Sequence, residues 1–179
     1  ALREQSHLKE VIDAINDPER FVVVQHAPAI SVTLGELLGL LTELGIEKNT
    51  LVFFSGDNGA ADYFASKQFP RGVYSGNKNP QTGVEYRGKK GVLYEGGIRV
   101  PFFAYWPGTI TPGRVSEHLG YFPDIMPTIA EVTGAKAPAD TDGLSFVPEL
   151  IGEAAAGRKQ AIHDYLYWET GGWCAIRQG

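Results

Sequence analysis

Two short clusters of polar residues could carry chemistry, and the first is the pair Asp57-Asn58. The pair follows the continuous apolar run Thr50–Phe54, at the end of an expected strand, where open α/β sheets place their ligands. An Asp carboxylate beside an Asn carbonyl offers hard oxygen ligands, which suit Ca²⁺ or Mg²⁺ better than a thiophilic metal. Asp, Asn and Gly are also standard turn formers, so Ser55–Gly59 by itself favours an ordinary turn over a metal site.

The second cluster is the basic, glycine-rich segment Tyr86–Pro101. It holds Arg87, Lys89 and Lys90 among four glycines and leads into an expected strand. Glycines let backbone N–H groups approach an anion closely, and a lysine adds a point charge. The alternative is a solvated loop that happens to be basic. That alternative weakens because the segment runs directly into a core strand, which keeps its residues near the edge of the sheet.

The elements expected to position these clusters alternate between helices and buried strands. Leucines at a spacing of three and four predict a helix over residues 32–44, and Gly45 is a good stop for it. In the run 50–54 apolar residues follow one another without alternating with polar ones, which suggests a central parallel strand covered on both faces. Residues 60–90 read as a long irregular loop, which is usually functional or mobile. The remaining expectations are a helix over 3–16, buried strands over 21–24 and 98–106, and a short helix between Pro127 and Gly134 that Asp124 caps or orients. They continue with a short apolar segment at 144–151, a polar loop at 152–160, and a hairpin of 163–168 with 173–177 that turns at Gly171-Gly172.

Composition sets limits on the kind of protein. The 179 residues contain 43% hydrophobic and 21% charged residues, which is ordinary for a globular protein. A net charge of −5 argues against nucleic acid as a partner. The single cysteine, Cys174, excludes an internal disulfide framework and a multi-cysteine zinc site, and we expect it to be a small buried strand residue. No apolar run reaches the roughly 18 residues of a membrane span, and both ends read as cuts.

Six segments in one order give the chain a resemblance to the type I sulfatases of the alkaline phosphatase superfamily. Those enzymes show T-L-V-x-F-x-S-D-N-G, then G-K-G-x-x-Y-E-G-G-x-R-x-P-F, then W-P-G. The corresponding segments here are Thr50–Gly59, Lys89–Phe102, Trp106–Gly108, Phe122–Thr128, Asp142–Phe146 and His163–Glu169. Each segment alone is weak, but the ordered set is highly specific and covers roughly residues 33–179.

The resemblance implies a fold and roles for the matched residues. The fold implied is α/β, a partial alkaline-phosphatase-like (sulfatase) sheet flanked by helices, with the start of a small C-terminal antiparallel subdomain. Asp57 and Asn58 match calcium ligands, with Mg²⁺ also possible, and Lys90 matches the lysine that contacts the substrate sulfate. Lys89 stands one position earlier, so a slip by one would transfer that substrate-binding role to it. Glu95 and Arg99 also match, and we interpret them as a structural Arg–carboxylate pair.

The resemblance also implies a nucleophile that these 179 residues do not contain. Type I sulfatases use a formylglycine made from Cys or Ser in a C/S-x-P-x-R motif, which lies upstream of D-N-G. Neither Cys174 nor any serine here begins such a motif, and His26 is a weak match to the family's upstream histidine. Formylglycine is therefore expected only in a missing upstream part, and the isolated chain is expected to be inactive.

Three functions remain open. The first is hydrolysis of a sulfate ester, aryl or carbohydrate, by the parent protein. The second is hydrolysis of a phosphoester or phosphonate by a member of the same superfamily, and the third is a noncatalytic truncated fragment. We divide the chain into a poorly matched segment 1–32, the later part of a catalytic domain at 33–150, and the start of a C-terminal subdomain at 151–179. Family resemblance suggests a periplasmic, secreted or lysosomal location, and the oligomeric state is not predicted.

Overall fold

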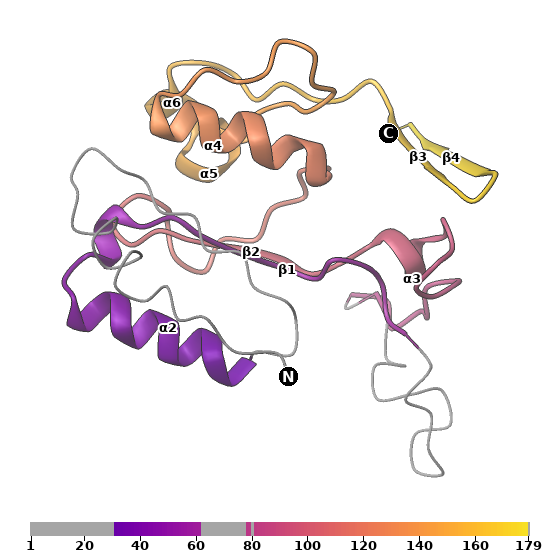
Figure 1. Cartoon of the computed structure of the whole chain (residues 1–179), viewed down its shortest axis with the longest axis horizontal. Helices are drawn as coiled ribbons and strands as arrows, with labels where there is room; N and C mark the ends of the chain where they lie inside the picture. The colour runs from indigo at the N-terminus through magenta and orange to yellow at the C-terminus, as the bar shows by residue number, and fades with distance from the viewer. Residues whose placement is uncertain (1–30, 62–77, 80, 179) are drawn as a thin grey trace, which may run out of the picture. The chain divides into compact units, whose positions relative to one another are not determined.

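The computed structural model describes residues 31–61, 78–79 and 81–178 (Figure 1). The chain divides into two compact units. The first unit comprises the described residues up to Phe53 together with Ala104–Ile162, and the second comprises those of Phe54–Phe103 and His163–Gly179. The predicted helix 3–16, the predicted strand 21–24 and His26 lie outside the described residues. The division of the chain at residues 32 and 150 stays a prediction.

Short elements make up both units. In chain order they are α2 (Ser31–Glu43), the 3₁₀ turn η1 (Glu47–Asn49), β1 (Val52–Ser55), α3 (Glu95–Ile98), β2 (Phe102–Tyr105), the 3₁₀ turn η2 (Phe122–Asp124), α4 (Ile125–Thr133), α5 (Val147–Ile151), α6 (Glu153–Ala156), β3 (Leu166–Thr170) and β4 (Trp173–Arg177). The structure confirms the expected helix at 32–44 and the hairpin near the C-terminus. It corrects the polar loop at 152–160, part of which forms α6, and the start of the strand at 98, since Ile98 closes a helical turn. None of the described helices is long and apolar enough to cross a membrane.

The strand that precedes Asp57 pairs with β2 in a two-stranded sheet. The amide of Gly56, just after β1, donates to the carbonyl of Pro101, just before β2, at 3.3 Å. The end of one strand therefore lies beside the start of the other, so the two strands run antiparallel. The sequence suggested a parallel strand at 50–54, and its pairing with β2 is not parallel. The expected burial of β2 is also wrong, because three of its four residues are exposed among the described residues. Only Ala104 of that strand is partly covered.

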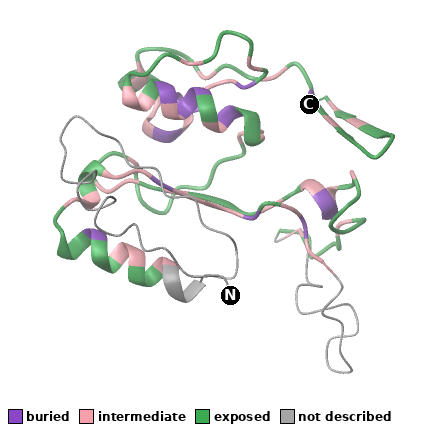
Figure 2. Ribbon diagram, viewed as in Figure 1, coloured by how far each residue is buried: buried purple, intermediate pink, exposed green. Residues whose placement is uncertain are grey.

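Most of the buried side chains in the first unit belong to the segments around α4 and α5 (Figure 2). The fully buried Thr128 of α4 donates to the carbonyl of Asp124 at 2.7 Å and accepts from the amide of Phe146 at 3.0 Å. Gly134 ends α4 in the left-handed conformation, with φ of 69°, as the sequence predicted. Two hydrogen bonds from Arg158 hold the pKa of the Glu131 carboxyl on α4 below its usual value.

Asp124 is fully buried at the start of α4, where its side chain makes no capping bond to the helix, so of the two predicted roles, capping and orienting, the structure supports the orienting one. Its carboxylate accepts hydrogen bonds from the amides of Tyr121 at 3.0 Å and Leu144 at 2.7 Å. An Asn at this position can accept only one of these bonds well, because its second terminal atom is a donor. We expect Asp124→Asn to lower the free energy of unfolding by about 2 kcal/mol, measured by urea denaturation. Asp142→Asn, at an exposed position, is the matched control and should change it by less than about 0.5 kcal/mol.

The C-terminal hairpin is a regular antiparallel pair. Leu166 lies opposite Arg177 and Thr170 opposite Trp173, and Gly171-Gly172 supplies the two positive φ angles of the turn, 52° and 83°. Leu166 is 1% exposed, whereas Cys174 is exposed. The predicted strand position of Cys174 is confirmed, but its predicted burial is wrong because its side of the hairpin is not covered by the described residues.

Candidate functional site

The Asp57-Asn58 pair lies in a turn directly after β1, as the sequence predicted. The Ser55 hydroxyl donates to the carbonyl of Gly56 at 2.9 Å, and the side-chain amide of Asn58 donates to the carbonyl of Gly59 at 3.1 Å. Because the nitrogen of the Asn58 side chain is used in this second bond, its Oδ1 oxygen remains a possible metal ligand. Asp57 is exposed and Asn58 half-buried, so both oxygens can reach a ligand.

Backbone hydrogen bonds bring the Lys90 loop onto this turn. The amide of Lys90 donates to the carbonyl of Ala60 at 2.9 Å, two residues after Asn58. The amide of Gly59 donates to the carbonyl of Gly97 at 2.9 Å. These two bonds span 30 and 38 residues of sequence, and they place the predicted metal ligands and the predicted sulfate-binding lysine in one region of the second unit.

Three glycines allow this close approach. A Cβ added at Gly59 would lie 1.9 Å from the carbonyl oxygen of Gly96, and one at Gly97 would lie 1.9 Å from that of Val92. A Cβ at Gly96 would lie 2.2 Å from the oxygen of Gly88. All three obstacles are backbone atoms, which cannot swing aside. The glycines are therefore required by packing between backbones and not only by local turn geometry.

The two lysines have different backbone environments. Both side chains belong to exposed residues. The amide of Lys90 contacts the Asp57-Asn58 segment through Ala60, whereas the carbonyl of Lys89 accepts from the amide of Val92 at 3.2 Å within the loop itself. The backbone of Lys90 is therefore bonded to the segment that follows the Asp57-Asn58 turn.

Glu95 and Arg99 form the predicted ion pair, with Arg99 Nε 2.6 Å from Glu95 Oε2 across one turn of α3. Arg99 also donates to the Tyr86 hydroxyl at 3.3 Å, and the Arg87 guanidinium lies 4.0 Å from the centre of the Tyr94 ring. These contacts link α3 to the start of the basic segment. They support the interpretation of Glu95 and Arg99 as structural residues.

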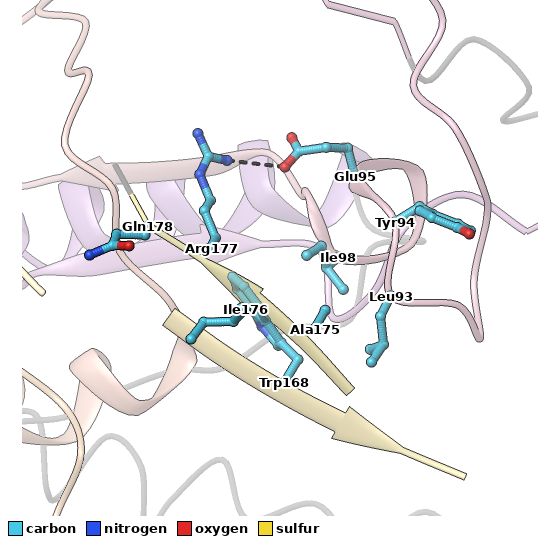
Figure 3. A pocket seen from close by; sticks show the side chains of 9 residues that line it. All are labelled: Leu93, Tyr94, Glu95, Ile98, Trp168, Ala175, Ile176, Arg177 and Gln178. Atoms are coloured by element: carbon cyan, nitrogen blue, oxygen red, sulfur yellow. Dashed lines mark hydrogen bonds and ion pairs between the residues drawn. The ribbon is translucent and has the colours of Figure 1, made fainter. Parts of the chain in front are cut away.

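Sequence reasoning missed Arg177. Its Nη1 lies 3.0 Å from Glu95 Oε1, although the two residues are 82 positions apart (Figure 3). A cavity of about 420 Å³ opens beside the pair, and its walls include Trp168 and Tyr94. No spacing in the sequence pointed to this contact, because the two residues belong to segments far apart in the chain that carry no local signal of each other.

The oxygen donors fit a hard cation but do not complete its coordination. Asp57 and Asn58 supply two oxygens, whereas Ca²⁺ takes six to eight. Among the residues that the structure describes, no group of three or more His, Cys, Asp or Glu side chains could hold a metal ion. Among the described residues the pair therefore offers two of the six to eight oxygen ligands that Ca²⁺ takes.

Comparison with known proteins gives one family. The family model described as Sulfatase matches residues 32–135. Steryl-sulfatase of Mus musculus is 38% identical over 136 residues, covering 75% of this chain and 20% of that protein. N-acetylgalactosamine-6-sulfatase of Rattus norvegicus is 40% identical over 124 residues, covering 68% of this chain and 22% of that protein.

The solved structures agree with the sequence comparisons. A sulfatase of Pseudoalteromonas sp., PsFucS1, aligns with a TM-score of 0.60 and 30% identity, covering 80% of this chain and 26% of that one. The fold is therefore that of a sulfatase, mixed helix and sheet, as the sequence predicted, and of its small antiparallel sheets the sequence predicted only the one at the C-terminus. The chain spans about a fifth of the length of the curated relatives it matches.

Proposed function

The chain belongs to the sulfatase family, and from this premise we propose that Asp57, Asn58 and Lys90 form one wall of the active site of a sulfuric ester hydrolase. The observation that carries the proposal is the backbone bond from Lys90 to Ala60, which joins the lysine loop to the Asp57-Asn58 turn. A cationic side chain and two hard oxygen ligands thereby meet in one region. Such a combination suits a substrate that is a tetrahedral oxyanion.

Each residue has a distinct proposed role. Lys90 binds a non-bridging sulfate oxygen as a point charge and orients the ester, and Lys89 is the alternative if the assignment slips by one residue. Asp57 and Asn58 hold Ca²⁺, or Mg²⁺, through Oδ atoms, together with ligands from the rest of the protein. The bound cation supplies neutralisation of the negative charge on the sulfate oxygens. The nucleophile, a formylglycine by family resemblance, belongs to residues outside the 179 considered.

The calcium role gives a direct prediction. In the whole protein, Asp57→Asn removes one carboxylate charge from the site, and we expect Ca²⁺ affinity to fall by about tenfold to a hundredfold, the range of a charged hydrogen-bond partner. Isothermal titration calorimetry with CaCl₂ measures the change without any need for turnover. Asp142→Asn, an exposed aspartate in the other unit, is the control and should bind as the wild type does. Unchanged affinity in Asp57→Asn would remove Asp57 from the ligand set.

The reaction itself is tested by comparing two esters on the whole protein. We expect 4-nitrophenyl sulfate to be hydrolysed with a kcat/KM well above that for 4-nitrophenyl phosphate, because the family and the similar proteins are sulfatases. The reverse order would favour a phosphoester hydrolase of the same superfamily. If the calcium-loaded protein hydrolyses neither ester, the result would favour the third possibility, a noncatalytic truncated gene product.

We propose that the substrate is a sulfate ester, aryl or carbohydrate. The two relatives described above are named for an N-acetylgalactosamine and for a steryl compound, so their names do not decide the substrate class. We propose that the isolated 179-residue chain does not turn over either class, because it contains no C/S-x-P-x-R motif. A periplasmic, secreted or lysosomal location is proposed from family resemblance.

A further inference from the structure

Glu95 binds two arginines at the same time. Its Oε2 atom accepts from Arg99 Nε at 2.6 Å, and its Oε1 atom accepts from Arg177 Nη1 at 3.0 Å. Arg99 lies one helical turn away, so that pair is local, whereas Arg177 is the last residue of β4. Figure 3 shows the Arg177 side chain reaching from the hairpin to the Glu95 carboxylate beside the cavity. The two bonds use different oxygens, so neither competes with the other.

Glu95 is also fixed to the loop that carries Lys90. It is the first residue of α3, and the next residue, Gly96, donates its amide to the carbonyl of Arg87 at 2.8 Å. The position after that, Gly97, lies so close to the carbonyls of Lys89 and Val92 that a Cβ there would overlap both, at 2.6 Å and 1.9 Å. A displacement of α3 must therefore displace residues 87–92, because no free space separates the two backbones.

From these contacts we propose that Arg177 is a positioning residue for Lys90, acting through Glu95 and α3. The C-terminal hairpin thereby fixes the loop that presents Lys90 to the substrate. The expected effect of Arg177 on kcat/KM rests on the proposed function. The contacts that link Arg177 to the Lys90 loop lie within the second unit and do not depend on that function. The effect should be moderate, since the Arg177 and Glu95 side chains are 35% and 38% exposed.

The test uses the whole protein and three single variants. Arg177→Gln removes the charge and the bond to Glu95, and Arg177→Lys keeps the charge but loses the planar fork of donors. Arg114→Gln is the matched control: Arg114 makes a comparable exposed ion pair with Glu149, at 3.3 Å, in the other unit. The first readout is the rate of tryptic cleavage after Lys89 and Lys90, followed by mass spectrometry, and the second is kcat/KM for a sulfate ester.

We expect Arg177→Gln to speed cleavage after Lys89 and Lys90, and to lower kcat/KM, each by up to about fivefold, the range of an exposed ion pair. Arg177→Lys should recover part of both effects, and Arg114→Gln should show neither. Cleavage in Arg177→Gln equal to that in Arg114→Gln overturns the proposal, and so does faster cleavage with unchanged kcat/KM. If the wild-type protein hydrolyses no sulfate ester, the proposed function fails, and the cleavage rates alone then decide whether Arg177 holds the loop.

Discussion

Replacement of Lys90 by alanine in the whole protein is expected to lower kcat/KM for a sulfate ester by about a hundredfold to a thousandfold. That is the usual effect of removing one charged or hydrogen-bonding group that stabilises the transition state. The reason is specific to this loop: the Lys90 amide is bonded to Ala60, so the side chain originates beside the Asp57-Asn58 turn. Steady-state kinetics with 4-nitrophenyl sulfate measure the loss.

The neighbouring lysine provides the control for this prediction. Lys89→Ala removes the same side chain one position earlier, at a residue that is also exposed. We expect a loss of less than about tenfold, since the amide bonded to Ala60 is that of Lys90, whereas the carbonyl of Lys89 accepts from Val92 within its own loop. A larger loss in Lys89→Ala than in Lys90→Ala would move the sulfate-binding role to Lys89. Turnover by Lys90→Ala close to the wild-type value would contradict the assignment of either role to Lys90.

Gly97→Ala is expected to have the largest effect on stability. The new Cβ would lie 1.9 Å from the carbonyl oxygen of Val92 and 2.6 Å from that of Lys89, so the loop and α3 must separate. Overpacking against backbone costs about 3 kcal/mol or more, and separation would also break the bond from Gly59 to Gly97. Urea denaturation of the whole protein measures the free energy of unfolding. Activity should fall with it, because the same bond joins the two halves of the site.

Gly39→Ala is the control that separates the loss of stability caused by backbone overlap at Gly97 from the effect of replacing any glycine by alanine. Gly39 lies in α2 with nothing within 4 Å of its added Cβ, so alanine there meets no obstacle. Alanine is the better helix former by about 0.5–1 kcal/mol, and we expect a small increase in stability. If Gly97→Ala unfolds at the same urea concentration as Gly39→Ala, the backbone packing between α3 and the Lys90 loop is not what holds the site together.

Local patterns predicted much of the fold. The leucine spacing predicted α2, Gly134 predicted the end of α4, and Gly171-Gly172 predicted the turn of the hairpin. These features depend on contacts within a few residues, where side-chain period and allowed φ values decide the outcome. The sequence failed where burial depends on distant segments. It predicted a buried strand over 98–106, and the strand that forms there, Phe102–Tyr105, is largely exposed among the described residues. It also predicted a buried Cys174, which is exposed.

Asp57, Asn58 and Lys90 show the same division within the candidate site. The sequence by itself determined the family and the residue types, because six short segments in a fixed order are too specific to arise from composition. Only the tertiary structure joined Lys90 to Ala60 and Gly59 to Gly97, and only it showed that Arg177 binds Glu95. The physical reason is that hydrogen bonds between segments thirty or eighty residues apart are set by the path of the whole chain. Neither partner carries a local signal of the other, so the residues could be named from the sequence, but the contacts that position them could not.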